Sequence, residues 1–303
     1  MRNVYAEFLR EQGDNVLNLD GIEWWGYGGF LMPAYLPHKI PEITPDNAHE
    51  ALRISGRPFV RWETNFDSLG RPSEWWHVLK RGRWDLSQVT SKKRRYLIRQ
   101  GRKNFKVRFM EENEVLELAP LVAQAAINRY KGFASPENKA LFARRLEAGR
   151  RIPGVLEYVG CFQGARLVSW CENHLHDGGV WMTTIRHDPN FLNLSSSYAL
   201  VDGLLEIYLN EREADFVLDG CRNIHHRTEF QSQLEKAFAF ERVFSKLNVA
   251  YGRAFGLGVK AALPFSELVF AVSARYSGRI IDNVAAVLRQ EAIRRSFLKD
   301  RSN

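Results

Sequence analysis

The sequence lacks several features that would place it quickly in a class of protein. Its 303 residues include only three cysteines, Cys161, Cys171 and Cys221, and their spacing matches no metal site. An odd, scattered set of cysteines is typical of reduced thiols, and it disfavours a disulfide-linked secreted domain. No metal ligand is therefore predicted, and a reducing compartment is expected.

Long apolar runs are also missing. No uninterrupted run approaches the roughly 18 apolar residues of a membrane-crossing helix, so none is expected. Glu7, Glu11 and Asp14 interrupt the first residues, which therefore lack the apolar centre of a signal peptide. We expect a cytoplasmic protein, or one bound peripherally at the inner membrane. The sequence does not indicate an oligomeric state.

Acidic residues are absent from residues 86–110, where nine basic residues gather. The segment carries a charge of +9, more than the net charge of +8 of the whole chain. Ser91 predicts a helix over 92–104, and its predicted anion-binding side chains are Lys92, Lys93, Arg94, Arg95 and Arg99. Such a cluster attracts phosphate in RNA, an anionic membrane surface or a nucleotide-bearing donor. A solvated helix face without a partner is the alternative.

Three β-branched and aromatic segments, 155–162, 166–174 and 180–186, predict an antiparallel meander. Gly164 and the pair Gly178 and Gly179 lie in the two connections, where tight turns need glycine. A mixed sheet flanked by helices is the fold class that we expect.

The third strand of the meander is predicted to continue into a βαβ-like unit. Ser195, Ser196 and Ser197 precede an apolar-periodic helix, and a second strand follows over 214–218. Serine at a helix N-cap accepts a backbone N–H, and the remaining free N–H groups suit a phosphate. Capping without anion binding is the alternative interpretation.

The chain is expected to divide into three parts. Residues 1–90 form a Trp-rich N-terminal α/β half, residues 91–265 form the main domain, and residues 266–303 form a helical extension. The apolar side of that extension is predicted from Leu268, Val272, Tyr276, Ile280, Val284, Val287 and Leu288.

Three stretches resemble the GNAT superfamily of N-acyltransferases, and more closely its Fem-type branch with proteins of cell-envelope polysaccharide loci. They are SKKRRYLIRQGRKNFKVRF, the strand–turn–strand YVGCFQGARLVSW, and LDGCRN followed by EKAFAFERVFSKLNVAY. The resemblance covers residues 91–252, and residues 1–90 resemble a reduced first copy of the fold only loosely.

The resemblance implies an acyltransferase that moves an acyl group from acyl-CoA to an amine, for example on a cell-envelope or polysaccharide precursor. In such folds the strand matching 180–186 separates from its parallel neighbour and leaves backbone N–H groups for the donor. The implied catalytic residues are Glu172, Asp219 and His226, with His174, His225 and Glu229 as further candidates. The implied donor-binding residues are Met182, Thr183, Thr184, Ile185, Arg186, Ser195, Ser196 and Ser197. Each of these side chains also has a surface or capping role as its alternative.

One departure from the superfamily bears on the donor. The glycine-rich pyrophosphate loop is missing, because the matching positions read RHDPNFLNLSSS. Two alternatives therefore remain, a Fem-like transferase that uses aminoacyl-tRNA and a non-catalytic module that binds anionic partners. A thiol nucleophile formed by Cys221 with His225 and His226 is disfavoured, because catalytic cysteine and histidine seldom lie so close in sequence.

Overall fold

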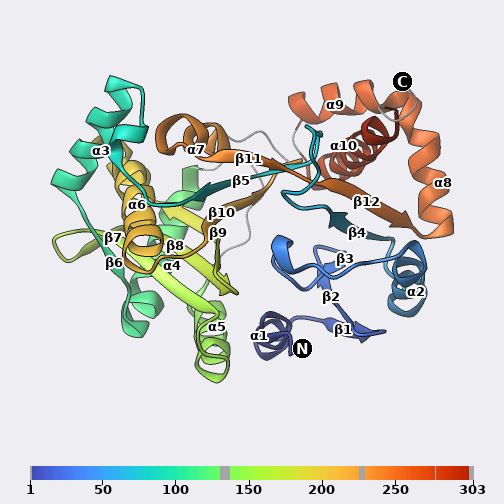
Figure 1. Ribbon diagram of the computed structural model, residues 1–303, viewed down its shortest axis with the longest axis horizontal. Coiled ribbons are helices and arrows are strands. Elements are labelled where there is room, and N and C mark those ends of the chain that lie inside the picture. The colour runs from blue at the N-terminus through green and yellow to red at the C-terminus, as the bar shows by residue number, and fades with distance from the viewer. Residues whose placement is uncertain (1, 130–136, 225–228, 277, 300–303) are drawn as a thin grey trace. The chain divides into compact units, whose positions relative to one another are not determined.

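The computed structural model describes residues 2–129, 137–224, 229–276 and 278–299, and their contacts divide into two units (Figure 1). Unit 1 comprises Met1–His77, Cys221–Thr228 and Val243–Asn303, whereas unit 2 comprises Val78–Gly220 and Glu229–Arg242. Unit 1 is therefore assembled mainly from the first and last parts of the sequence, with one short segment, Cys221–Thr228, that interrupts unit 2.

Unit 1 contains a five-stranded mixed sheet in the order β1-β2-β3-β4-β12. Its elements are α1 (Val4–Glu11), β1 (Val16–Leu19), β2 (Ile22–Tyr27), β3 (Phe30–Pro33), α2 (Pro45–Ser55), β4 (Phe59–Thr64), β12 (Lys246–Tyr251), α8 (Arg253–Ala262), α9 (Ser266–Arg275) and α10 (Arg279–Lys299). One core joins Trp24, Leu31 and Val60 to Ala48 and Leu52 of α2. Because α2 starts at a capping box between Thr44 and Asn47, its apolar face is fixed against this sheet.

Unit 2 carries most of a seven-stranded sheet in the order β11-β5-β10-β9-β8-β7-β6. Its elements are α3 (Lys92–Asn104), β6 (Lys106–Phe109), α4 (Glu112–Arg129), α5 (Lys139–Arg151), β7 (Leu156–Gln163), β8 (Arg166–His176), β9 (Gly179–His187), α6 (Ser196–Leu205) and α7 (Phe230–Phe238). The strands β5 (Trp76–Arg81), β10 (Phe216–Cys221) and β11 (Glu241–Phe244) each contain a boundary between the units. A π-helical segment, Glu206–Glu211, continues α6.

The predicted meander is confirmed. β7 pairs with β8 and β8 with β9, both antiparallel, and residues at positive φ close the turns: Gly164 (φ 60°), Asp177 (φ 45°) and Gly178 (φ 78°). Glycine suits these positions because it has no Cβ to oppose the left-handed backbone. The core on one face of these strands joins Trp170 and Phe142.

The helix over 92–104 is confirmed with its predicted cap, since the Ser91 hydroxyl accepts the backbone N–H of Arg94. The βαβ order is confirmed as well, because β10 pairs with β9 in parallel after α6. The α5 helix starts after Asn138, whose side chain accepts the backbone N–H of Leu141.

The segment 241–251 divides between the two sheets. Its first strand, β11, joins the seven-stranded sheet, and its second, β12, pairs antiparallel with β4 in unit 1, from Lys246↔Thr64 to Tyr251↔Phe59. Ser245 alone separates the two strands. The chain changes sheets within one residue, a change that alternation of apolar residues does not reveal.

The C-terminal helices also differ from the expectation. Five of the seven residues of the predicted apolar side are exposed rather than packed, namely Leu268, Val272, Tyr276, Ile280 and Val284, and Leu288 is buried. The helical stretch Arg253–Arg275 is also long and apolar enough to cross a membrane by length and composition alone. The absence of an unbroken apolar run concealed it, because Lys260 and Glu267 interrupt an otherwise apolar segment.

Close packing of α6 on β6 predicts opposite effects for two helical glycines. A Cβ on Gly203 of α6 would lie 2.4 Å from the Cβ of Val107, whereas a Cβ on Gly258 of α8 would meet nothing within 4 Å. We expect Gly203→Ala to destabilise the fold by about 1–3 kcal/mol through overpacking. Gly258→Ala should stabilise it by roughly 0.5–1 kcal/mol, because alanine loses less backbone entropy in a helix. Thermal melting of both variants checks this.

The combination of Gly203→Ala with Val107→Gly gives the control. If the clash is with Val107, this second change should restore part of the lost stability. Equal melting temperatures for Gly203→Ala and the wild type would contradict the close packing.

Candidate active site

The centre of unit 2 is the place where two parallel strands stop pairing. β9 and β10 form three pairs, Phe216↔Gly179, Val217↔Val180 and Leu218↔Trp181, and both strands then continue without pairing to each other. The predicted donor-binding residues Met182, Thr183, Thr184 and Ile185 lie on β9 beyond the last pair. The β9 edge that faces β10 therefore has backbone groups outside the ladder, where a bound molecule can pair with them.

A β-bulge in β9 coincides with this divergence. On the β8 side, Glu172 pairs with Thr184 and Asn173 pairs with Met182, so Thr183 is the extra residue. The Thr183 hydroxyl lies 3.1 Å from the backbone oxygen of Glu172 and 3.2 Å from its carboxylate Oε1. A bulge bends the strand that contains it, which fits the departure of β9 from β10.

Glu172 is the most completely satisfied polar side chain of the site. Its carboxylate is buried and accepts hydrogen bonds from Arg145 Nη1 (2.7 Å), Tyr158 Oη (2.6 Å), His174 Nε2 (3.1 Å) and Thr183. Because a carboxylate only accepts, Nε2 of His174 must carry the proton of that bond. The donors come from α5, β7, β8 and β9, so Glu172 links a helix to three strands.

These donors keep Glu172 ionised. Burial alone would raise the pKa of the carboxyl, but the hydrogen bond from His174, the charge of Arg145 and the hydrogen bond from Tyr158 lower the pKa to about 2. A group that holds its proton so weakly is a poor general base at neutral pH. The environment suits Glu172 to positioning Thr183 rather than to accepting a proton.

Asp219 has the opposite electrostatic environment. It follows Leu218, the last β10 residue paired with β9, and its side chain is only partly accessible to solvent. Burial raises the pKa of the carboxyl from 3.8 to about 7, and a hydrogen bond from Gln231 of α7 offsets part of that shift. A carboxylate with this pKa can both accept and release a proton near neutral pH.

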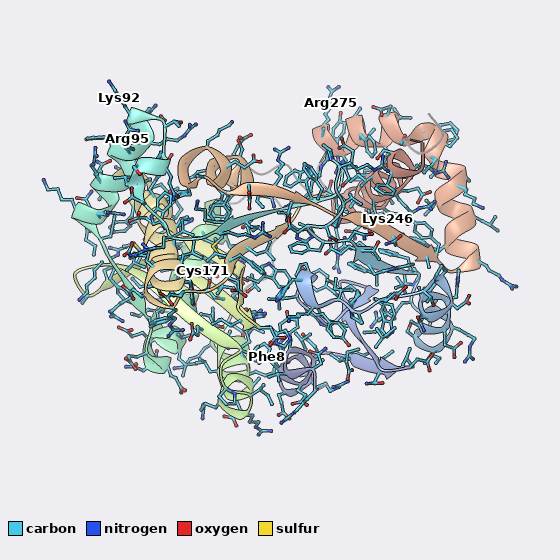
Figure 2. The ribbon with its side chains drawn as sticks, in the orientation of Figure 1. Phe8, Lys92, Arg95, Cys171, Lys246 and Arg275 are labelled. Carbon is cyan, nitrogen blue, oxygen red and sulfur yellow. The ribbon has the colours of Figure 1, made fainter. Side chains whose placement is uncertain are left out.

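Cys171 on β8 lies near both carboxylates. The charges of Glu172 and Asp219 add to burial in raising the pKa of its thiol well above the ordinary value. Figure 2 labels Cys171 within unit 2. A thiol held protonated is a weak nucleophile, so the geometry does not support Cys171 as the attacking group.

The predicted phosphate site at the start of α6 is enclosed by protein. Ser195 adopts a left-handed conformation (φ 69°) and makes no cap hydrogen bond, so the predicted serine cap was wrong. Its hydroxyl donates instead to Gln100 Oε1 of α3 (2.9 Å). Ser196 is also buried, and its hydroxyl has no hydrogen-bond partner among the described residues, while Ser197 is partly exposed. A Cβ on Gly101 would lie 3.0 Å from Ala199 N, so α3 covers the first turn of α6 closely.

Arg186, the cation expected beside this helix, is already paired. Its Nε and Nη2 contact the two carboxylate oxygens of Glu137 at 2.9 and 3.1 Å. Because the geometry is bidentate, a phosphate would have to displace a strong partner. The contacts around α6 therefore do not favour an anion there, and the role of these residues remains a prediction.

The basic helix α3 divides into paired and exposed cations. Lys92, Lys93 and Arg99 are exposed, and Figure 2 shows Lys92 projecting outward from α3. Arg94 is partly exposed, and Arg95 donates to the carbonyl oxygens of Val89 and Thr90. Only part of the predicted anion-binding set is therefore available to a partner.

The remaining candidates contribute less. His225 and His226 lie outside the described residues, and Glu229 is exposed. Cys221 belongs to unit 1. No group of three or more His, Cys, Asp or Glu side chains in the described part of the chain could hold a metal ion.

Unit 1 contains a second buried carboxylate, Glu63. Its Oε2 contacts Ser245 Oγ at 2.5 Å and His77 Nε2 at 2.7 Å. Both groups meet the same oxygen, so the arrangement differs from a nucleophile–histidine–carboxylate relay. The cluster ties β4, β5 and the residue between β11 and β12 together.

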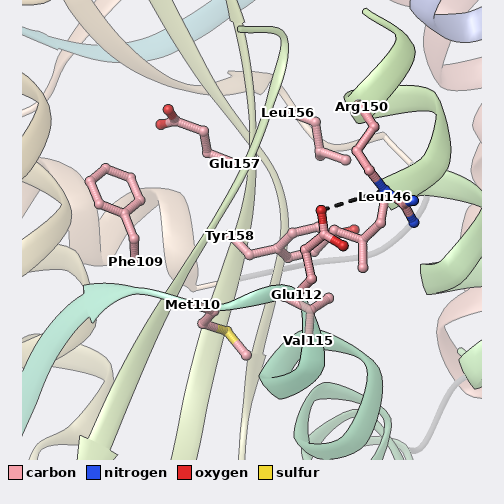
Figure 3. A pocket seen from close by; sticks show the side chains of 10 residues that line it. Phe109, Met110, Glu112, Val115, Leu146, Arg150, Leu156, Glu157 and Tyr158 are labelled. Atoms are coloured by element: carbon pink, nitrogen blue, oxygen red, sulfur yellow. Dashed lines mark ion pairs between the residues drawn. The ribbon is translucent and has the colours of Figure 1, made fainter. Parts of the chain in front are cut away.

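A small cavity in unit 2 lies beside Tyr158 and is separate from the strand divergence. It has a volume of about 230 Å³ and is lined by Phe109, Met110, Glu112, Val115, Leu146, Gly149, Arg150, Leu156, Glu157 and Tyr158 (Figure 3). An ion pair between Arg150 Nε and Glu112 Oε1 (3.5 Å) lies at its edge. None of the predicted catalytic or donor-binding residues lines it.

Comparison with known proteins supports the fold. No protein-family model matches the sequence, and no curated protein matches it. The C-terminal domain (DUF2156) of a candidate lysylphosphatidylglycerol synthetase from Agrobacterium fabrum matches with a TM-score of 0.53 and 11% identity, over 86% of this chain and 92% of that one. FemX matches with a TM-score of 0.53 and 9% identity, over 80% and 89%. L-PGS from Bacillus licheniformis matches with a TM-score of 0.50 and 15% identity, over 80% and 86%. These matches and the two mixed sheets confirm the mixed sheet flanked by helices that the sequence predicts.

Sequence reasoning missed the residues that surround the two carboxylates. Arg145, Tyr158 and Gln231 each lie on a different element. Arg145 and Gln231 belong to none of the stretches that carry the resemblance, and Tyr158 opens one of them without being marked as functional. The available signal was weak: Tyr158 and Glu172 occupy the paired strands of the meander and are direct partners in its register. The sequence position of Arg145, on the separate helix α5, does not indicate that it contacts Glu172.

The Glu172 network predicts a large loss of stability on Glu172→Gln. The change leaves Arg145 partly buried without its carboxylate, which should cost roughly 3–5 kcal/mol. Because the pKa of Glu172 is lowered from 4.5 to about 2, its stabilising effect is present above about pH 4.5 and is lost as the pH falls toward 2. Denaturant unfolding of both proteins across this pH range checks the prediction.

Glu147→Gln is the matched control, since Glu147 also lies on α5 and pairs with Arg150 and Arg151 but is half-exposed. It should cost about 1 kcal/mol or less. Similar losses for the two variants would count against a special role for the buried network.

Proposed function

We propose that this chain transfers an activated acyl group to an amine at the divergence of β9 and β10, with Asp219 as the proton acceptor. The observation that carries the proposal is the position of Asp219, partly buried and directly beyond the last β9–β10 pair, and its raised pKa of about 7 supports the role of base. The GNAT-like fold supports it, and so does the position of the predicted donor-binding residues on β9. The finer likeness to the Fem-type branch is part of the same proposal.

Asp219 takes a proton from the attacking ammonium or amine, and the nitrogen forms a bond to the carbonyl carbon of the donor. Backbone N–H groups of residues 182–185 stabilise the oxygen of the tetrahedral intermediate. The bond from the carbonyl carbon to the sulfur or oxygen of the donor then breaks, and the leaving group takes up a proton, for which protonated Asp219 is one source.

Two donors fit this chemistry, an acyl-CoA and an aminoacyl-tRNA. The covered start of α6 and the pairing of Arg186 with Glu137 weaken the case for a CoA pyrophosphate at that helix. The exposed cations of α3 suit an RNA backbone instead. One of the structural matches is named as a domain of a lysylphosphatidylglycerol synthetase, a name that refers to a lysyl group, and this supports an aminoacyl donor. The acceptor proposed from the resemblance is an amine on a cell-envelope or polysaccharide precursor.

Asp219 predicts the pH dependence of the reaction. Activity should rise with pH and reach half its maximum near pH 7, because the base must be deprotonated. Asp219→Asn should lower kcat/KM by roughly 10²–10⁴-fold. Mass spectrometry measures acyl transfer to amine acceptors, with acetyl-CoA, longer acyl-CoAs and a pool of aminoacyl-tRNAs as the donors.

Two controls accompany this variant. Glu211→Gln changes an exposed carboxylate of unit 2 that is not among the candidate catalytic residues, and it should leave activity unchanged. Asp219 should also bind a proton in the folded chain between about pH 4 and 7, where the unfolded chain has lost it. The free energy of unfolding of the wild type should therefore fall, relative to that of Asp219→Asn, as the pH rises from about 4 to 7. Full activity of Asp219→Asn would refute the proposed base, and absence of transfer from every donor would favour the non-catalytic alternative.

The exposed cations of α3 provide the test of the donor. Combined Lys92→Glu, Lys93→Glu and Arg99→Glu substitutions should weaken binding of bulk tRNA by about tenfold or more at low salt. They should also reduce the slope of log affinity against log salt by about 1 for each phosphate that the helix no longer neutralises. Acyl-CoA binding, followed by thermal shift, should change little if CoA does not use this helix.

Arg83→Glu with Arg144→Glu is the control, since both arginines are exposed in unit 2 and neither belongs to α3. Arg95 and Arg102 are kept, because each stabilises the local fold through its own contacts. Tight acyl-CoA binding without any tRNA binding would reverse the preference between the two donors.

A further inference from the structure

The helices α8 and α9 of unit 1 leave almost all of their side chains in contact with solvent. From residue 253 to residue 276, Val259 is the one buried residue. Leu257, Phe265 and Leu268 are 68%, 62% and 64% exposed. Monomeric soluble proteins rarely expose apolar side chains over so continuous a stretch, and such a stretch usually marks an interaction site.

The two helices form a bent arm rather than a straight rod. A short 3₁₀ turn, Leu263–Phe265, joins them and contains Pro264, and Figure 1 shows α8 and α9 meeting at this bend. Both helices contact α10, so the arm has support on its inner side. The stretch has the length and composition of a membrane-crossing helix, but the bend and the contacts with α10 suit an arm that lies along a surface.

The charges on this arm are mainly positive. Arg253, Lys260, Arg275 and Arg279 are opposed over residues 253–279 only by Glu267. In the described part of the chain, Arg253 and Lys260 have no carboxylate within ion-pairing distance. Figure 2 labels Arg275 at the end of α9.

A cavity beside α8 extends the positive surface. It has a volume of about 680 Å³, and the basic residues Lys246, Arg253, Lys260 and Arg294 line it together with Leu257. Its carboxylate, Glu291, is held by Arg294 and Arg295 at 2.7 Å each. The cavity therefore keeps a positive excess directly beside the exposed apolar side chains.

We propose that α8 and α9 dock this protein on an anionic lipid bilayer. Leu257, Phe265 and Leu268 enter the boundary between headgroups and acyl chains, while Arg253 and Lys260 contact lipid phosphates. A bilayer satisfies both features of the arm, because it offers apolar chains beneath a layer of negative charge. The proposal is independent of the donor and of the role of Asp219.

A second copy of the chain fits this face less well. Symmetric pairing through the arm would bring its basic residues close to the same residues of the other copy, and like charges in an interface are costly. The proposal also differs from membrane binding through α3, which carries cations but few exposed apolar side chains.

The experiment is flotation of the full chain with vesicles made of equal parts phosphatidylcholine and phosphatidylglycerol, and with vesicles of phosphatidylcholine alone. The wild type should float with the anionic vesicles and bind the neutral ones more weakly. The combined substitutions Leu257→Ser, Phe265→Ser and Leu268→Ser should weaken binding on the order of a hundredfold. Arg253→Glu and Lys260→Glu should each weaken it at least about fivefold on the anionic vesicles.

Three exposed apolar residues of unit 2 give the matched control. Tyr96→Ser, Leu121→Ser and Leu192→Ser, made together, remove side chains that are 62%, 67% and 46% exposed outside the arm. This variant should float like the wild type, and unchanged melting temperatures would show that all the variants are folded.

Three results would overturn the proposal. The first is a wild type that does not float with the anionic vesicles. The second is a serine variant of the arm that floats like the wild type. The third is loss of flotation on charge reversal of α3 while the arm variants still float. Light scattering tests the alternative that a second copy of the chain covers the arm. A wild-type dimer that the arm substitutions convert to monomer, without vesicle binding by either protein, would identify the face as an interface between two copies.

Discussion

The hydrogen bonds of the Thr183 hydroxyl to Glu172 hold the extra residue of the β9 bulge against β8. Without these hydrogen bonds, β9 would be held less firmly in the bend that separates it from β10 after three pairs. The bend leaves unpaired backbone on β9 and places Asp219 beyond the last β10 pair. Glu172 in turn is held by Arg145, Tyr158 and His174, so an ionised carboxylate fixes the geometry of the opening while a second carboxylate is left to exchange protons.

Two carboxylates of similar chemistry thus differ because of their neighbours. Glu172 meets four donors and keeps its charge, whereas Asp219 is desolvated with less compensation and its pKa rises. The sequence identified both residues but could not separate their roles. That separation depends on donors from α5, β7 and α7, which reach the site only through the tertiary fold. Spacing along the chain contains no record of those contacts.

Local signals predicted much of the fold. Glycines in the turns indicated the meander, and Ser91 marked the start of α3, because both depend on residues next to each other in sequence. Ser195 carried the same kind of signal and misled, since a hydrogen bond to Gln100 of α3 replaces the cap. The change of sheet at Ser245 and the exposure of α8 and α9 were also missed. Periodicity reports that a face is apolar, but not whether another element covers it.

The pairing of β12 with β4 affects how the chain can fold as it is synthesised. β4 can pair with β3 on one side early, but its other edge pairs with a strand that lies beyond all of unit 2 in sequence. During synthesis unit 2 can therefore complete its sheet around β7, β8 and β9 first, through connections that are short. The N-terminal part of unit 1 meanwhile keeps an open strand edge, the kind of surface on which wrong pairing and aggregation begin. The sheet that β4 belongs to is thus completed only by a strand that is synthesised after unit 2.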